Sequence, residues 1–302
     1  MLIVLDHDDG LGAAGLDGAR AERDEERYAA FLMASLPLLA AAPQRRGRYG
    51  CLDAALDAAP RAGVGVELGV WRGRSLRRSA HRQPWRHFHG FDSLTGFPED
   101  GRPDWQQDFA VASPPTLPGN CTFHAGFFDQ TLPPFAVGAT SPVALLNLDC
   151  DIYLSAHQGL VALAPLIGPG TAIHLDEAVN YDTWLFNEML ALFRFLDQAG
   201  LDIRWIARSG RVRDLAETLR FLEAGRYPRW ADDVAAGFGR PAACVLVPRA
   251  ADWAPAPPGL GARLAARAAA HHARTQHRED CDPGDPMAPP WPRWRRWLAR
   301  WR

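Results

Sequence analysis

Short runs of apolar, β-favouring residues recur along the middle of the chain, and segments long enough for a helix separate them. The seven runs are residues 64–70, 87–91, 121–125, 143–148, 171–175, 203–207 and 242–247. The run VALLNL at 143–148 has the apolar character of a central parallel strand that is covered on both faces. The pattern therefore predicts an α/β fold with a doubly wound, mostly parallel seven-stranded sheet and right-handed crossovers.

Helical periodicity is clearest between residues 183 and 199. Apolar side chains recur there at spacings of three and four and form one stripe: Leu185, Met189, Leu192, Phe193 and Leu196. Residues 18–42 also predict a helix, which Pro43 closes.

The two ends of the chain differ from this alternation. Prolines and alanines dominate from about residue 250, and the chain finishes with WPRWRRWLARWR. We expect a helical N-terminal extension over 1–45, a main domain over 46–249, and a Pro/Ala-rich linker with a Trp/Arg amphipathic tail over 250–302.

Charge and composition exclude several classes of protein. The 33 basic residues nearly balance the 35 acidic ones, and the net charge of -2 gives no electrostatic reason to expect a nucleic acid partner. Every basic residue is arginine, so a Schiff-base enzyme and a Walker-type phosphate loop are excluded, and a single arginine carries little weight. Five scattered cysteines argue against a zinc site or a disulfide framework. With no signal peptide or membrane span in the sequence, we expect a cytoplasmic protein.

Ligands in doubly wound sheets bind beyond the carboxyl ends of the strands, so the candidate residues follow the predicted strands. Glu67, Gly69 and Gly73 follow the first strand in a G-x-x-x-G pattern that lacks the glycines of a pyrophosphate site. The acidic Glu67 suits a ligand with a cationic amine. Alternatively, this stretch binds no ligand and is an ordinary strand-to-helix turn.

The next two strands add a carboxylate and aromatic rings. Asp92 either accepts hydrogen bonds from a ribose diol or caps the next helix. Residues 126–129 offer aromatic rings that could flank a planar base.

Carboxylates also follow the fourth and fifth strands. Asp149, Asp176 and Glu177 would converge on one point, where they repel one another unless a cation or a shared proton intervenes. Such oxygen ligands suit Mg²⁺, Mn²⁺ or Ca²⁺. Asp149 or Asp151 could instead cap the next helix. His174 and Glu188 are weaker candidates for a general base. His174 is expected to be a core histidine instead, and Glu188, which could point toward the pocket, is expected to be a solvated helix carboxylate.

Five stretches in order, VELGVWRGRS, FHGFDSLTGFPED, FHAGFFDQTLPPF, LLNLDCDIYLSA and PGTAIHLDEAVNYDTWLFNE, resemble the motifs of class I S-adenosylmethionine-dependent methyltransferases, most closely the macrocin O-methyltransferase type. The resemblance spans about residues 50 to 200 and implies a Rossmann-like methyltransferase fold. It implies a cofactor set of Glu67, Gly69, Trp71, Gly73, Ser75, Asp92, Ser93, Gly126 and Phe128. It also implies Mg²⁺ ligands at Asp149, Asp176 and Glu177, with Asp149 and Asp176 catalytic.

The function expected is methylation of a hydroxyl on a small molecule or sugar, with Mg²⁺ assisting proton removal. Metal-using relatives tend to carry paired aspartates after the fifth strand, whereas this chain has Asp176 and Glu177. Two alternatives from other classes are a nicotinamide-dependent oxidoreductase and a non-catalytic interaction protein. In the second, Trp294, Trp297, Leu298 and Trp301 among arginines would contact an anionic membrane surface or a partner, unless the tail folds back or stays disordered. The sequence does not determine whether the protein forms a homo-oligomer.

Overall fold

The computed structural model describes residues 18–98, 109–181, 183–225, 227–228 and 230–267. Its centre is one eight-stranded sheet with the order β1-β7-β8-β6-β5-β2-β3-β4. The strands are β1 Gln44–Arg45, β2 Val64–Leu68, β3 Phe88–Asp92, β4 Cys121–Ala125, β5 Val143–Leu148, β6 Ala172–Leu175, β7 Leu201–Gly210 and β8 Phe238–Pro248. β8 pairs antiparallel with both of its neighbours, while the other pairs are parallel. This confirms the predicted α/β, mostly parallel sheet.

The eighth strand is the difference from prediction. β1 is two polar, exposed residues long and pairs in parallel with β7, where Gln44 lies opposite Arg208. No apolar pattern marks such a strand, because neither of its faces is buried.

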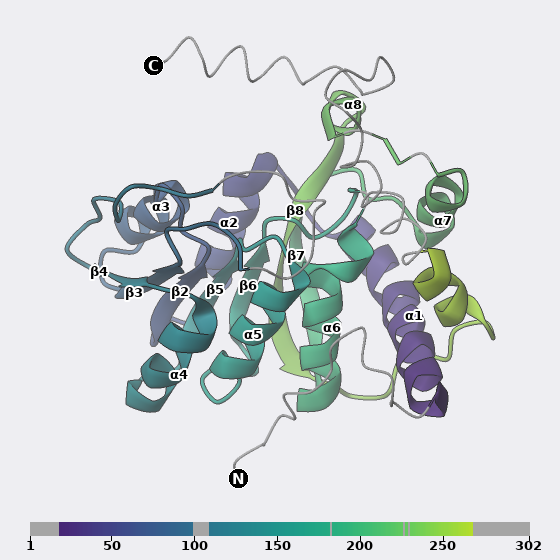
Figure 1. The fold of residues 1–302 in the computed structure, drawn as a ribbon, viewed down its shortest axis with the longest axis horizontal. Coiled ribbons are helices and arrows are strands. Elements are labelled where there is room, and N and C mark those ends of the chain that lie inside the picture. The colour runs from purple at the N-terminus through teal and green to yellow at the C-terminus, as the bar shows by residue number, and fades with distance from the viewer. Residues whose placement is uncertain (1–17, 99–108, 182, 226, 229, 268–302) are drawn as a thin grey trace.

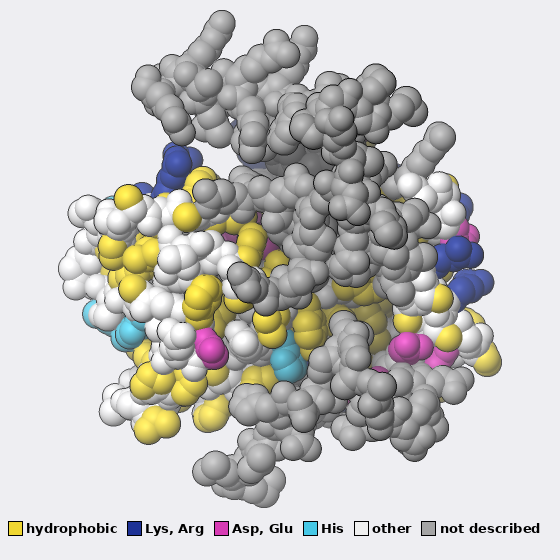
Figure 2. Space-filling view, in the orientation of Figure 1, with side chains coloured by type: hydrophobic (Ala, Val, Ile, Leu, Met, Phe, Trp, Pro, Cys, Tyr) yellow, Lys and Arg dark blue, Asp and Glu magenta, His cyan; other side chains and the backbone are white. Residues whose placement is uncertain are grey.

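Helices cover both faces of the sheet (Figure 1). They are α1 Gly18–Ala41, α2 Gly47–Ala58, α3 Arg74–Arg82, α4 Phe128–Gly138, α5 Tyr153–Leu163, α6 Glu188–Ala199, α7 Leu215–Glu223 and α8 Trp230–Ala235. α2 and α3 lie on one face, and α4, α5 and α6 lie on the other. In the space-filling view, arginines lie at the edges of the face that α4 to α6 cover, and hydrophobic side chains occupy much of its visible middle (Figure 2).

The helix predicted over 183–199 is interrupted near its start. A 3-10 turn, Trp184–Phe186, precedes α6, and Asn187 between them has φ -107 and ψ -125, which is not helical. The apolar stripe was therefore right for α6 but also counted Leu185, which belongs to the preceding turn.

Two hydrophobic clusters form the core, one on each side of the sheet. The larger contains buried side chains of α1, α4, α5 and α6, and the smaller contains those of α2 and α3. All six residues of β5 are buried, as its apolar sequence predicted. The sheet is thus fixed between two apolar layers, which leaves the carboxyl ends of the strands to carry polar groups.

Both extensions contribute to this core. α1 confirms the predicted N-terminal helix, and its Phe31 is fully buried. Trp253 packs edge-on against Phe31 with ring centroids 5.2 Å apart, and Leu264 is buried. Side chains of residues 253–264 therefore anchor this segment to the domain, where the composition predicted a linker. The tryptophans and arginines of 291–302 lie outside the described residues.

Two smaller findings concern expectations from composition. The four described cysteines, Cys51, Cys121, Cys150 and Cys244, are free thiols, and Cys281 lies outside the described residues. No described helix combines the length and apolar character that a membrane crossing requires.

Candidate functional site

A cavity of about 1250 Å³ lies at the carboxyl ends of the central strands. The loops that follow β2, β3, β5 and β6 line it, together with the first turn of α2. Non-glycine residues with positive φ occur in these loops: Trp71, Leu94, Asp151 and Asn180 follow β2, β3, β5 and β6. Strained backbone of this kind gathers at functional sites.

Gly69 joins the loop after β2 to the loop after β5. It has φ +85, and a Cβ added there would lie 1.8 Å from the backbone oxygen of Asp149. Only glycine permits both this conformation and this approach. The loop after β2 and the residues that follow β5 are therefore in direct backbone contact.

Asp92 joins the loops after β2 and β3. One carboxylate oxygen, Oδ2, accepts hydrogen bonds from the backbone N–H groups of Val70 (2.9 Å) and Trp71 (2.7 Å). The other, Oδ1, accepts one from Leu94 N–H at 2.8 Å. A carboxylate has about four acceptor positions, so Asp92 keeps room for a ligand hydroxyl at the cavity.

Glu67 is buried beneath this loop and does not line the cavity. Its carboxylate accepts hydrogen bonds from Ser75 Oγ and from Asn147 Nδ2, both at 2.8 Å. His174 Nδ1 lies 2.6 Å from Asn147 Oδ1 and extends this buried row across β2, β5 and β6. Burial raises the pKa of Glu67 to about 7 and lowers that of His174 to about 3. The expectation that His174 belongs to the core is confirmed.

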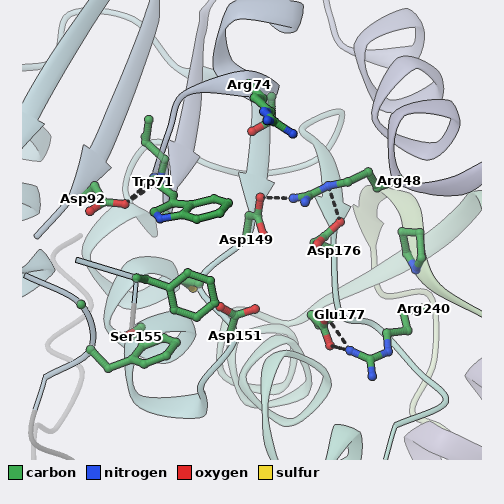
Figure 3. Close-up of a pocket in the computed structure, with 18 of the residues that line it drawn as sticks. Arg48, Trp71, Arg74, Asp92, Asp149, Asp151, Ser155, Asp176, Glu177 and Arg240 are labelled. Carbon is green, nitrogen blue, oxygen red and sulfur yellow. Dashed lines mark hydrogen bonds and ion pairs between the residues drawn. The ribbon is translucent and has the colours of Figure 1, made fainter. Parts of the chain in front are cut away.

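Aromatic side chains form one wall of the cavity. Trp71, Phe97, Phe109, Phe127 and Phe128 line it. The rings of Trp71 and Phe109 meet edge-on with centroids 5.7 Å apart. In the close-up, the Trp71 ring lies between Asp92 and Asp149 (Figure 3).

The opposite wall is built from carboxylates and arginines. Arg48, in the first turn of α2, reaches between Asp149 and Asp176 (Figure 3). Its Nη2 pairs with Asp149 Oδ2, and its Nε lies 3.0 Å from Asp176 Oδ1. The Asp149 side chain is 16% exposed and that of Asp176 is 13% exposed, so both carboxylates depend on this cation for charge balance.

Glu177 has an arginine of its own. Arg240 Nη1 lies 2.8 Å from both of its carboxylate oxygens. Glu188, at the start of α6, accepts a hydrogen bond from Glu177 N–H through Oε2 at 3.1 Å. Glu188 is fully buried, and its Oε1 has no hydrogen-bond partner among the described residues. The expectation of a solvated Glu188 was wrong, because α6 begins in the interior, where Glu188 contacts the Glu177 backbone.

These groups shift one another's titration. Burial, with repulsion from Asp176, raises the pKa of Asp149 well above its ordinary value, and Arg48 opposes the rise. Burial raises the pKa of Glu177 to about 7, and Arg240 opposes that rise. A carboxylate with a raised pKa is a better proton acceptor than an ordinary aspartate.

Most of the predicted site residues converge on the cavity. Those that line it are Gly69, Trp71, Ser75, Asp92, Ser93, Phe128, Asp149, Asp176 and Glu177. Three predicted residues are absent from its lining. Glu67 is buried below it, Gly73 faces Pro115 and Leu117, and Gly126 faces Thr131.

The predicted metal ligands do not fit a divalent cation as they stand. Arg48 and Arg240 already pair with all three carboxylates. Within the part of the chain that the structure describes, no group of three or more His, Cys, Asp or Glu residues is arranged to hold a metal ion. Neither arginine could be singled out from the sequence, since the chain contains 33 of them.

Comparisons with known proteins give one family match and several similar solved structures. Residues 66–178 match a family model described as a methyltransferase domain. Among solved structures, the calicheamicin methyltransferase CalS11 is 24% identical, with 65% of this chain and 94% of that chain covered and a TM-score of 0.40. The O-methyltransferase NovP is 27% identical, with 42% and 61% covered and a TM-score of 0.33. A search of curated proteins finds no match.

Proposed function

We propose that the chain is an S-adenosylmethionine-dependent methyltransferase and that it methylates a hydroxyl group of a small acceptor such as a sugar. The match of residues 66–178 to a methyltransferase domain supports this proposal. The observation that carries the proposal is the placement of Asp149 and Asp176. These carboxylates directly follow the neighbouring parallel strands β5 and β6. They line the same cavity as Asp92 and Gly69. A hydroxyl acceptor must lose a proton on methylation, and a carboxylate beside the acceptor can take it.

The cofactor fits the β2–β3 side of the cavity in its chemistry. S-adenosylmethionine supplies an electrophilic methyl group on a sulfonium and carries an amine, a ribose and a base, but no phosphate. We assign the ribose hydroxyls to Asp92 and the base to Phe128 and its neighbour Phe127. We assign the methionine part of S-adenosylmethionine to the loop after β2, where Gly69 has no side chain to block it.

The acceptor belongs on the side of Asp149. Methyl transfer is a direct displacement, so the protein contributes alignment of the acceptor oxygen and removal of its proton. Asp149 is the proton acceptor in this proposal, because its pKa is raised and its carboxylate lines the cavity. The rings of Trp71, Phe97 and Phe109 provide an apolar wall for the rest of the acceptor.

Magnesium has no step in this proposal. The sequence predicted Mg²⁺ between Asp149, Asp176 and Glu177, but Arg48 and Arg240 pair with these carboxylates. Proton removal is therefore assigned to Asp149 alone.

The test uses the full chain, S-adenosylmethionine with a labelled methyl group, and a panel of sugars, vicinal diols and amines. We expect label in an O-methyl product and one S-adenosylhomocysteine formed per transfer. Label found only on amines would contradict the hydroxyl assignment. Binding of NAD in place of S-adenosylmethionine would restore the oxidoreductase hypothesis.

A further inference from the structure

Arg48 reaches the cavity from a part of the chain that precedes the matched methyltransferase domain. β1 pairs with β7 just before it, and Gly47 N–H donates a hydrogen bond to Ser209 Oγ at 3.2 Å. Gly47 has φ +63, so the chain turns sharply into α2. These contacts fix the first turn of α2 above the ends of β5 and β6.

The Arg48 guanidinium has two carboxylate partners at different nitrogens. Nη2 pairs with Asp149 Oδ2, and Nε lies 3.0 Å from Asp176 Oδ1 (Figure 3). A guanidinium is planar, always charged and rich in donors, so it can hold two carboxylates in a fixed relation. With Arg240 on Glu177, two fixed positive charges face these three carboxylates.

We propose that Arg48 takes the place of a divalent cation in this site, holding Asp149 in position for the acceptor and making methyl transfer independent of metal. The proposal rests on the function proposed above. Arg48 is a positioning residue, since it contacts Asp149 and Asp176 and acts through them.

Mg²⁺ would have to displace this arrangement before it could bind. The ion requires near-octahedral oxygen ligands at about 2.0–2.1 Å. Asp149 Oδ2 accepts a hydrogen bond from Arg48, and both oxygens of Glu177 accept from Arg240. Asp176 Oδ1 lies 3.0 Å from Arg48 Nε as an ion pair, without a hydrogen bond among the described residues. A dication placed among them would also lie beside two guanidinium groups of the same sign, which is unfavourable in a partly buried site.

The direct experiment measures metal binding without catalysis. Mn²⁺ alone is titrated into the full-length protein and followed by electron paramagnetic resonance. We expect no bound Mn²⁺ for the wild type. We expect binding after Arg48→Ala, because that change leaves Asp149 and Asp176 without their cation. Arg82→Ala is the control, since it removes a similar arginine–aspartate pair on the surface, with Asp57. Mn²⁺ bound by the wild type at these carboxylates would overturn the proposal.

A second experiment measures turnover with and without EDTA. Wild-type turnover should change by less than about twofold. Arg48→Ala should lower kcat by roughly 100-fold through misplacement of Asp149, with the affinity for S-adenosylmethionine unchanged. Arg48→Lys keeps the charge but not the planar geometry, so its kcat should lie between those of the wild type and Arg48→Ala. Loss of wild-type turnover in EDTA, with recovery on adding Mg²⁺, would refute the inference.

The two experiments separate this inference from the proposed function. If no hydroxyl acceptor is methylated, the proposed function fails while the Mn²⁺ titration still decides the role of Arg48. Thermal unfolding checks that each variant folds. Arg48→Gln retains the stem of the side chain and replaces Arg48→Ala in both experiments if the alanine variant does not fold.

Discussion

The loops after β2 and β3 are held together by backbone N–H groups that donate to the Asp92 carboxylate, whereas the loops after β5 and β6 are held by ion pairs between side chains. On the β2–β3 side, Asp92 bonds to backbone N–H groups 21 and 22 positions earlier in the chain. On the β5–β6 side, Asp149 pairs with Arg48 across 101 positions, and Glu177 with Arg240 across 63.

This difference separates two tasks. The side assigned to the cofactor depends on geometry that one strand-turn-helix unit and its neighbour provide. The side assigned to the acceptor depends on charge balance between distant segments, so it can change through a single side chain without altering the sheet. Substitutions on the two sides should therefore fail in different ways.

Gly69→Ala should have the largest effect, and it acts where the loop after β2 meets the backbone of the loop after β5. The new Cβ would meet the backbone oxygen of Asp149 at 1.8 Å, in a conformation with φ +85. We expect a loss of about 3 kcal/mol or more in the free energy of unfolding, and greatly weakened binding of S-adenosylmethionine. Urea unfolding and calorimetry measure the two effects.

Gly119→Ala is the matched control, because a Cβ there meets nothing within 4 Å. It should change stability by less than about 0.5 kcal/mol. Equal behaviour of the two variants would show that the approach at Gly69 is unimportant.

Asp149→Asn should have the next largest effect, and it acts on the charge-built side. An amide cannot accept the acceptor proton, so kcat should fall roughly 100- to 10,000-fold. Affinity for S-adenosylmethionine should stay within about threefold, because the cofactor is assigned to the other side. Steady-state kinetics and calorimetry test both statements. Asp53→Asn, which alters the surface pair with Arg78, is the control. Full turnover by Asp149→Asn would remove the proton-acceptor role.

Glu67→Gln should change how stability depends on pH. Burial raises the pKa of Glu67 to about 7, from 4.5 in the unfolded chain. The folded protein keeps this proton between these values while the unfolded chain loses it, so the free energy of unfolding falls as pH rises through this window. Glu67→Gln has no carboxyl group to titrate, so its free energy of unfolding lacks this decrease with pH. Its stability relative to wild type should therefore increase by about 3 kcal/mol from pH 4.5 to above pH 7.

Urea unfolding at several pH values measures this difference. Glu223→Gln, at an exposed position of α7, should show no such trend. A stability difference between Glu67→Gln and wild type that does not vary with pH would mean that folding does not raise the pKa of Glu67.

Arg82→Ala should have the smallest effect. The pair between Arg82 and Asp57 is exposed on the surface, where such pairs contribute less than about 1 kcal/mol. A larger loss in urea unfolding would mean that this pair stabilises the fold more than exposed ion pairs usually do.

The sheet could be predicted because apolar periodicity reports burial. Seven of the eight strands were located from their apolar runs, and the family match confirms the resemblance to methyltransferases. β1 escaped because its two residues are polar and exposed. The packing of Trp253 against Phe31 was also missed, since composition alone does not reveal a long-range contact.

The site was predictable where a motif places a residue at a strand end. Asp92, Asp149 and Asp176 were located in this way, and all line the cavity. The pattern could not tell which way a side chain points, so Glu67 was expected at the ligand but lies buried below it. Arg48 was missed for another reason. Its role follows from tertiary contacts, which the sequence does not show for one arginine among 33.

Calorimetric titration of the full chain with S-adenosylmethionine, in EDTA, tests the central claim most directly. The account predicts one bound cofactor per chain in the wild type and in Asp149→Asn, and strongly reduced binding in Gly69→Ala. Absence of binding to the wild type, or undiminished binding to Gly69→Ala, would contradict it.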